Sequence, residues 1–339
     1  MNKVLCFGEL LLRLSPRLNK EWIQQASMPV YVGGAELNVA TALATWNVPV
    51  TYVTALPNHY LSKEVIESLQ EKNMDTSNIF ISQNSGGRIG TYYLPQGADL
   101  KNAGVIYDRY HSVFSQLQPG QLDWEKILED VSWFHFSAIN PAINENIAAV
   151  CKEALHVASS NNITISVDLN YRAKLWQWGK QPVKVMPELV SYCDIIMGNI
   201  WAAETMLGIK INPAMKRAKK ELLEQSQNTS EAIKEQYTNC RQVANTFRFD
   251  ESEGLQYYAT LFDEKQMWVS EEHQTSFTVD KVGSGDTFMA GLIYGNYNKL
   301  PAQDTINFAA AAAFNKLFIK GDATTSTVED IRKGVKQYG

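Results

Sequence analysis

The chain has 339 residues, of which 45% are hydrophobic and 20% charged, which is enough for one large α/β domain with a buried core. The formal net charge of −5 argues against a nucleic-acid partner, because binding to a phosphate backbone needs a concentrated basic surface. No segment approaches the length of a transmembrane helix, and the four cysteines have no Cys-x-x-Cys spacing. These features predict a cytoplasmic protein with reduced thiols and no membrane partner.

The first predicted element is a strand in the apolar run from Val4 to Arg13. Two stretches, about residues 11–31 and 87–111, do not follow the helix and strand alternation found later in the chain. Within the second stretch, residues 88–94 and 105–109 have the composition of two short strands around a turn at Gly97.

Two glycines, Gly33 and Gly34, directly precede a predicted helix that runs to about Trp46. Paired glycines let a ligand lie directly on the backbone. Asn38, one turn into the helix, offers both a donor and an acceptor to the hydroxyl groups of a ligand. The pattern therefore predicts a binding site at the start of this helix.

From about residue 131 strands and helices alternate cleanly. The expected elements are a strand at 132–139, a helix at 144–159, a strand at 163–168, a helix around 183–192 and a strand at 194–198. Repeated βαβ units imply a mostly parallel sheet that binds ligands at the carboxyl ends of its strands. Asp168, Asn170 and Asn199 lie at such ends. Residues 212–237, rich in Lys, Glu and Gln, predict a helical insertion on the surface.

Residues 283–287 read Gly-Ser-Gly-Asp-Thr and place an acid, Asp286, where a loop turns into a helix. Backbone N–H groups of Gly283, Ser284 and Gly285 at such a helix start have no intrahelical partner and can hold an anion. Asp286 can then take the proton of an attacking hydroxyl while these groups stabilise an arriving phosphoryl group. The alternative is a simple helix cap, because Gly, Ser and Asp are common turn and cap residues.

Together, the Gly-Gly-x-x-x-Asn motif at 33–38 and the Gly-x-Gly-Asp motif at 283–286 resemble the ribokinase-like (PfkB) carbohydrate kinase family in type, order and separation. The resemblance runs over nearly the whole chain and implies one kinase domain, residues 1–339. It implies a three-layer α/β/α fold with a mostly parallel central sheet. Strands from residues 11–31 and 87–111 would form a small β lid over the sugar that also makes a homodimer contact. ATP would be the phosphoryl donor and Mg²⁺ the cofactor.

Two arginines narrow the choice of substrate. Arg109 lies in the lid segment and Arg172 follows the strand that ends at Asp168. Two guanidinium groups that converge on a pocket favour a substrate with a carboxylate, although a lone arginine is usually a surface ion-pair partner. Both segments, Tyr-x-Arg and Asp-x-Asn-x-Arg-x-x-Leu-Trp, resemble the 2-keto-3-deoxygluconate kinase branch of the family.

Carried over position by position, the resemblance implies a sugar acid whose terminal 6-hydroxyl points at Asp286, the general base. The residues that would contact the sugar acid are Gly33, Gly34, Asn38, Tyr92, Tyr107, Arg109, Ile139, Arg172 and Asp322. Asp168, Asn170, Asn199 and Glu204 would serve the nucleotide or the metal.

The chain departs from the family pattern in two places. Ala202 occupies the glutamate position of the usual Asn-x-x-Glu motif, and Glu204 lies two residues later. The usual Thr-x-Gly-x-x-Gly nucleotide turn has no counterpart in residues 246–254. Two alternatives therefore stay open: a sugar-acid-binding relative without efficient phosphoryl transfer, and a kinase of a neutral sugar or nucleoside.

Overall fold

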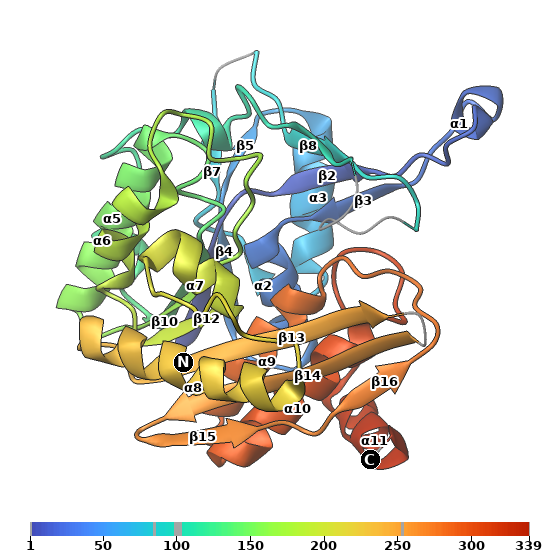
Figure 1. The fold of residues 1–339 in the computed structure, drawn as a ribbon. Helices are drawn as coiled ribbons and strands as arrows, with labels where there is room; N and C mark the ends of the chain where they lie inside the picture. The colour runs from blue at the N-terminus through green and yellow to red at the C-terminus, as the bar shows by residue number, and fades with distance from the viewer. Residues whose placement is uncertain (1, 84–85, 98–103, 252–253, 339) are drawn as a thin grey trace.

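Figure 1 shows the fold as a computed structural model, which describes residues 2–83, 86–97, 104–251 and 254–338. The strands of the main sheet are β1 (Lys3–Phe7), β4 (Val50–Val53), β6 (Met74–Asp75), β10 (Val131–Ser137), β11 (Thr164–Asp168), β12 (Ile195–Gly198), β13 (Gln242–Glu251), β14 (Gly254–Asp263), β15 (Gln266–Val269) and β16 (His273–Thr275). Their order is β15-β14-β13-β12-β11-β10-β1-β4-β6, with β16 paired to β14. Neighbours from β6 to β13 are parallel, whereas β14, β15 and β16 form an antiparallel extension.

Helices cover both faces of this sheet, as expected for buried parallel strands. The helices are α1 (Glu21–Gln24), α2 (Ala35–Thr45), α3 (Tyr60–Gln70), α4 (Trp124–Ile127), α5 (Glu145–Ser160), α6 (Met186–Val190), α7 (Ile200–Leu207), α8 (Lys219–Gln236), α9 (Ser284–Tyr297), α10 (Ala302–Lys316) and α11 (Val328–Tyr338). Strand β1 shows how the core divides. Leu5 and Phe7 pack in one apolar cluster with α4, α5 and α6, while Val4 and Cys6 pack in a second with α2, α9 and α10.

A second, smaller sheet has the order β3-β2-β8-β9. Its strands are β2 (Leu11–Leu14), β3 (Val30–Gly33), β8 (Gly90–Tyr93) and β9 (Ile106–Asp108). They come from the two stretches that interrupt the alternation of the sequence, so the short strands predicted there are present. We call this sheet the lid sheet. In Figure 1 it lies apart from the ten-stranded sheet, and α1 projects beyond it.

The segment predicted as a helical insertion on the surface, residues 212–237, contains α8, which packs one face on the rest of the protein. One of its faces is buried, including Leu222, Ser226 and Ile233. Ser226 Oγ donates to Asn245 Oδ1 of β13 at 2.8 Å and lies 2.8 Å from Thr260 Oγ1 of β14. The predicted helix is therefore present, and α8 lies in the connection between β12 and β13. Many side chains on this buried face are small, polar and hydrogen-bonded, so the sequence shows few apolar residues at helical spacing.

The helix predicted around residues 183–192 is also shorter than expected. Residues Pro182–Lys184 form a 3₁₀ turn, and α6 begins at Met186. Each segment has a proline in its first turn, Pro182 in the 3₁₀ turn and Pro187 in α6. Proline favours the start of a helix and disrupts its interior, so two short helical segments form here and not one continuous helix. No helix in the described part of the chain is long and apolar enough to cross a membrane.

Candidate active site

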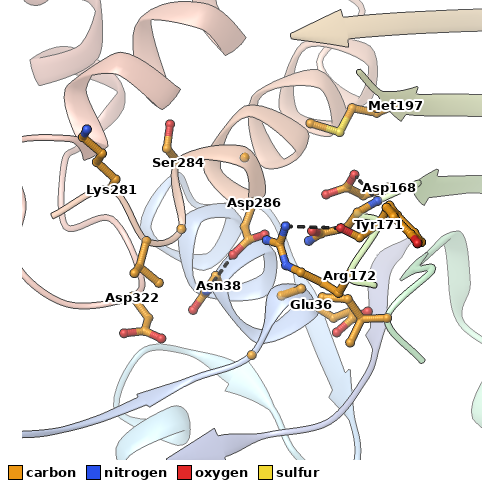
Figure 2. Close-up of a pocket in the computed structure, with 18 of the residues that line it drawn as sticks. Glu36, Asn38, Asp168, Tyr171, Arg172, Met197, Lys281, Ser284, Asp286 and Asp322 are labelled. Carbon is orange, nitrogen blue, oxygen red and sulfur yellow. Dashed lines mark hydrogen bonds between the residues drawn. The ribbon is translucent and has the colours of Figure 1, made fainter. Parts of the chain in front are cut away.

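One pocket is lined by nearly all of the predicted site residues, and Figure 2 shows it in close-up. It lies where the lid sheet, the start of α2, the ends of β11 and β12 and the turn before α9 meet. The predicted residues in its lining are Gly34, Asn38, Tyr92, Tyr107, Arg109, Ile139, Asp168, Asn170, Arg172, Asn199, Gly283, Ser284, Gly285, Asp286 and Asp322. Gly33 and Glu204 are the two predicted residues outside this lining.

Asp286 stands in the first turn of α9 with only 9% of its surface exposed. Gly283, the N-cap residue, has φ 80°, and a Cβ on it would lie 1.7 Å from the Asp322 carbonyl oxygen. Only glycine fits this turn, which brings the start of α9 and its N–H groups to the pocket. Burial raises the pKa of Asp286 to about 6, against the lowering effects of Asn38 and Arg172.

The glycine pair before α2 makes room for close contacts. Gly34 has φ 142°, and a Cβ on it would lie 2.4 Å from the carbonyl oxygen of Glu9. A Cβ on Gly33 would lie 2.2 Å from Asp322 Oδ2. Gly34 therefore presents its backbone to the pocket, whereas Gly33 accommodates the Asp322 carboxylate from outside the lining.

The two predicted arginines have different surroundings. Arg172 is partly exposed and lies close to Asp286 in Figure 2; in the described part of the chain it donates to the Tyr171 carbonyl oxygen at 3.5 Å and joins no ion pair. Arg109 is buried, and its Nε lies 2.6 Å from Glu9 Oε2. Glu9 also accepts a hydrogen bond from Ser112 Oγ at 2.5 Å. The charge of Arg109 is thus balanced by the protein itself, while that of Arg172 faces the pocket.

Asp322 is held by residues of the lid sheet. Tyr92 donates to Asp322 Oδ2 at 2.7 Å, and Arg13 Nε lies 2.7 Å from Asp322 Oδ1. Arg13 also pairs through Nη2 with Asp280 Oδ2 at 2.7 Å, although only 3% of its side chain is exposed. This buried pairing ties β2 to the turn before α9 through Asp280, and it ties both β2 and β8 to the loop after α10 through Asp322. The sequence pattern did not single out Arg13, because its partners lie more than 260 residues away.

Two further acids at the pocket, Glu36 and Asp168, are buried. Burial, together with the nearby Asp286 carboxylate, raises the pKa of each to about 7. Glu36 accepts hydrogen bonds from the Ser137 N–H at 2.9 Å and from its hydroxyl at 2.5 Å. Asp168 accepts one from the Asn170 N–H at 3.0 Å. The pocket therefore concentrates acidic groups, and a bound cation would favour their ionised forms.

The residues considered for the metal or nucleotide divide into two groups. Asp168, Asn170 and Asn199 line the pocket, and Asn199 caps α7 by accepting from the Ala202 N–H at 2.8 Å. Glu204 is exposed on α7 and lies outside the lining, whereas Ala202 is part of it. Two residues correspond to a 200° rotation around a helix, so Glu204 points away from the side where Ala202 stands.

The sequence patterns did not predict several of the residues that line the pocket. They are Glu9, Leu11, Ala35, Glu36, Tyr171, Met197, Gly198, Ala202, Thr246, Arg248, Tyr257, Lys281 and Val282. Thr246 and Arg248 lie on β13, Tyr257 on β14 and Lys281 beside the start of α9. A spacing of two within a strand could have indicated that Thr246 and Arg248 share a face, but not which face.

The chain matches the pfkB family carbohydrate kinase description over residues 1–327. It is 24% identical to the 2-dehydro-3-deoxygalactonokinase of Haloferax volcanii, over 98% of this chain and 96% of that protein. It is 23% identical to the 2-dehydro-3-deoxygluconokinase of Bacillus subtilis, over 86% of this chain and 82% of that protein. The crystal structure of the Thermotoga maritima 2-dehydro-3-deoxygluconokinase is 35% identical, with a TM-score of 0.88 and coverage of 99% of this chain and 98% of that one.

These similarities agree with the observed architecture, which is the ribokinase-like α/β fold with a mostly parallel central sheet. The family match spans nearly the whole chain and includes both glycine-rich motifs of the pocket. The protein therefore belongs to the pfkB family of carbohydrate kinases.

Proposed function

We propose that this kinase transfers the γ-phosphoryl group of ATP to the 6-hydroxyl of 2-keto-3-deoxygluconate. The observation that carries the proposal is the convergence of Asp286 and Arg172 in one pocket. One is a buried carboxylate beside the N-terminus of a helix, and the other is a guanidinium outside any ion pair of the described residues. The names of the similar proteins from H. volcanii, B. subtilis and T. maritima support a keto-deoxy sugar acid.

The pocket offers suitable partners for each end of such a substrate. Arg172 would pair with the carboxylate, because a guanidinium matches the two oxygens of that group. Asn38 would contact the hydroxyl end: its Oδ1 is buried and accepts no hydrogen bond from the described residues, so a sugar hydroxyl can donate to it. On the side of the lid sheet, the substrate would contact Tyr92, Tyr107 and Arg109.

Asp286 would act as the general base. At neutral pH a carboxyl group with a pKa of about 6 is mostly ionised, yet it is more basic than an exposed aspartate. It would accept the proton of the 6-hydroxyl as that oxygen bonds to phosphorus and ADP departs. The N–H groups of residues 283–286 would stabilise the negative charge of the transferred group.

The donor set of the pocket fits a magnesium ion that is bound mainly through phosphate oxygens and water. Within the described residues no three acidic, histidine or cysteine side chains gather as a metal cluster, but Asp168, Asn170 and Asn199 supply oxygen donors in the lining. Mg²⁺ keeps several waters and needs only one or two protein carboxylates. When bound, the ion neutralises negative charge on the triphosphate.

We also propose that the lid sheet forms a homodimer contact. Val30, Val32 and Ile106 lie on its strands β3 and β9 and are 53%, 38% and 62% exposed. Such apolar side chains on an outer sheet face favour a partner. Val32→Asp should shift the molecular mass measured by light scattering from that of a dimer to that of a monomer. A wild-type monomer at micromolar concentration would contradict the contact.

The test of the proposed reaction is ADP release by the wild-type chain with 2-keto-3-deoxygluconate, its galactonate epimer, fructose and ribose. The proposal expects kcat/KM for a keto-deoxy acid to exceed that for either neutral sugar, and ³¹P NMR of the product to show a 6-phosphate. Faster turnover of a neutral sugar would overturn the substrate assignment. Binding of the acid without ADP release would instead indicate a non-catalytic relative.

A further inference from the structure

Strand β13 occupies the place where the family usually has a glycine-rich nucleotide turn, which this sequence lacks. It continues as extended strand through Glu251 and pairs with β14 from Gln242↔Asp263 to Glu251↔Gly254. Because residues 246–251 belong to this ladder, their backbone cannot curl around a phosphate as a glycine-rich turn does. A bound triphosphate must therefore find its partners among side chains.

The side chains of β13 alternate between two environments. Phe247 and Phe249 pack on Tyr258, and their ring centroids lie 4.9 and 6.5 Å, respectively, from the centroid of the Tyr258 ring. The three rings belong to a cluster that includes residues of α7 and α8. Thr246 and Arg248 instead line the pocket. The period of two along a strand accounts for this division. The apolar packing of the two phenylalanines fixes the strand, and with it the face on which Arg248 stands.

A second cation, Lys281, lines the same pocket from the turn before α9. Figure 2 shows it beside Ser284, with Asp286 between it and Arg172 in this view. Its Nζ lies 2.5 Å from Asp250 Oδ1, and the two side chains are 25% and 36% exposed. A partly solvated pair of this kind is weak, so Lys281 can exchange Asp250 for a stronger anion at little cost.

The balance of charge in the pocket favours a role for both cations, Arg248 and Lys281, in binding an anion. Its lining includes five acids, which are Glu9, Glu36, Asp168, Asp286 and Asp322. Arg109 is paired with Glu9, and Arg172 is assigned to the sugar carboxylate. Glu9 is balanced by Arg109 and Asp322 by Arg13, but a triphosphate that entered without further positive charge would still be repelled by Asp286 and by the ionised forms of Glu36 and Asp168. Arg248 and Lys281 are the remaining basic residues in the lining.

We infer that Arg248 and Lys281 bind the phosphate groups of the nucleoside triphosphate, in place of a glycine-rich backbone turn. The inference rests on the proposed function. Arg248 offers a planar, two-pronged donor that matches phosphate oxygens, and Lys281 offers a point charge next to the helix start where the transferred group would lie. Both reach the pocket from elements that the central sheet and α9 hold in place.

The test compares ATP with adenosine as calorimetric probes of Arg248→Ala and Lys281→Ala. Each variant should raise the Kd of ATP about tenfold or more, which is the range for loss of a charge-assisted hydrogen bond. The Kd of adenosine, which carries no phosphate, should stay within about twofold of wild type, as should the KM of the sugar acid. Matched controls are Arg241→Ala and Lys265→Ala, exposed residues outside the pocket lining that should not change ATP binding.

Two further variants separate phosphate binding from a structural role. Asp250→Asn removes the anion that competes for Lys281, so ATP should bind as well as or better than in wild type; if Lys281 only tethered β13, this variant would weaken ATP as Lys281→Ala does. Arg248→Lys keeps the charge and should retain part of the affinity if Arg248→Ala fails to fold.

An ATP Kd within about twofold of wild type in both alanine variants would overturn the inference. So would equal weakening of ATP and adenosine, which would place the contacts away from the phosphates. A wild-type chain that binds ATP but phosphorylates no sugar acid would contradict the proposed function alone, because the comparison of ATP with adenosine would still decide the role of the two cations.

Discussion

The side-chain amide of Asn38 donates a hydrogen bond of 2.6 Å to Asp286 Oδ2, which joins two motifs 248 residues apart in the sequence. The bond stabilises the ionised form of the buried Asp286 carboxylate, and it leaves the amide oxygen of Asn38 for a ligand. The packing of α2 against α9 thus links the predicted sugar-binding motif directly to the predicted base.

Replacing the base tests the proposed chemistry most directly. Asp286→Asn should lower kcat by about 10²–10⁴-fold, because it removes the proton acceptor and keeps the size and polarity of the side chain. Sugar binding, measured by calorimetry, should stay nearly unchanged. A kcat within about threefold of wild type would show that another group accepts the proton.

The pH dependence of kcat/KM should report the ionisation of Asp286. Its pKa of about 6 lies above that of an exposed aspartate, so activity should fall as the pH drops through about 6 and the base becomes protonated. Asn38→Ala removes a donor to the ionised carboxylate and should therefore move this acidic limb to higher pH. A limb that stays in place in Asn38→Ala would mean that a different group controls it.

The role of Arg172 should appear as discrimination between charged and neutral substrates. Arg172→Leu should raise the KM for 2-keto-3-deoxygluconate about 10- to 100-fold, because a charge-assisted contact is worth about 1.5–3 kcal/mol. The neutral analogue with a hydroxymethyl group in place of the carboxylate should be affected much less. The exposed Arg17, replaced by leucine, is the control. Equal losses for both substrates would make Arg172 a structural residue.

Arg109 should matter for stability, in contrast to Arg172. Arg109→Leu leaves Glu9 buried without its cation, and such a loss typically costs about 3–5 kcal/mol in the free energy of unfolding. Arg88→Leu, which breaks the half-exposed pair with Asp108 of β9 and two hydrogen bonds to backbone carbonyl oxygens, should cost less than Arg109→Leu in urea unfolding. The double variant Glu9→Leu/Arg109→Leu should lose less than the two single variants combined. Similar costs for Arg109→Leu and Arg88→Leu would contradict this assignment.

The two acidic positions considered for the metal should behave differently. Glu204 is exposed outside the pocket, so Glu204→Gln should leave the Mg²⁺ concentration for half-maximal activity unchanged. Ala202 lines the pocket, so Ala202→Glu should lower that concentration or leave it alone. A higher Mg²⁺ requirement in Glu204→Gln would contradict the position of this residue in the structure. Activity without any divalent metal would contradict the kinase chemistry itself.

The sequence by itself determined the family, the fold class and the start of α9. Both glycine motifs can be read locally, because the left-handed φ of Gly283 and the free N–H groups of a helix start follow from the adjacent residues, although the contact that leaves no room for a Cβ on Gly283 is with the distant Asp322. The alternation of strand and helix after residue 131 likewise follows from the periodicity of apolar side chains.

Only the tertiary structure decided the partners of the charged residues. Arg13, Glu9 and Arg109 are paired with groups that are 100 residues away or more, and no local pattern specifies such pairs. The buried face of α8 was missed for a related reason: its polar side chains are satisfied by strands β13 and β14, which adjoin it only after folding. Long-range packing also placed Arg248 in the pocket and left Glu204 outside it, since a side chain's direction depends on which face of its element the core covers.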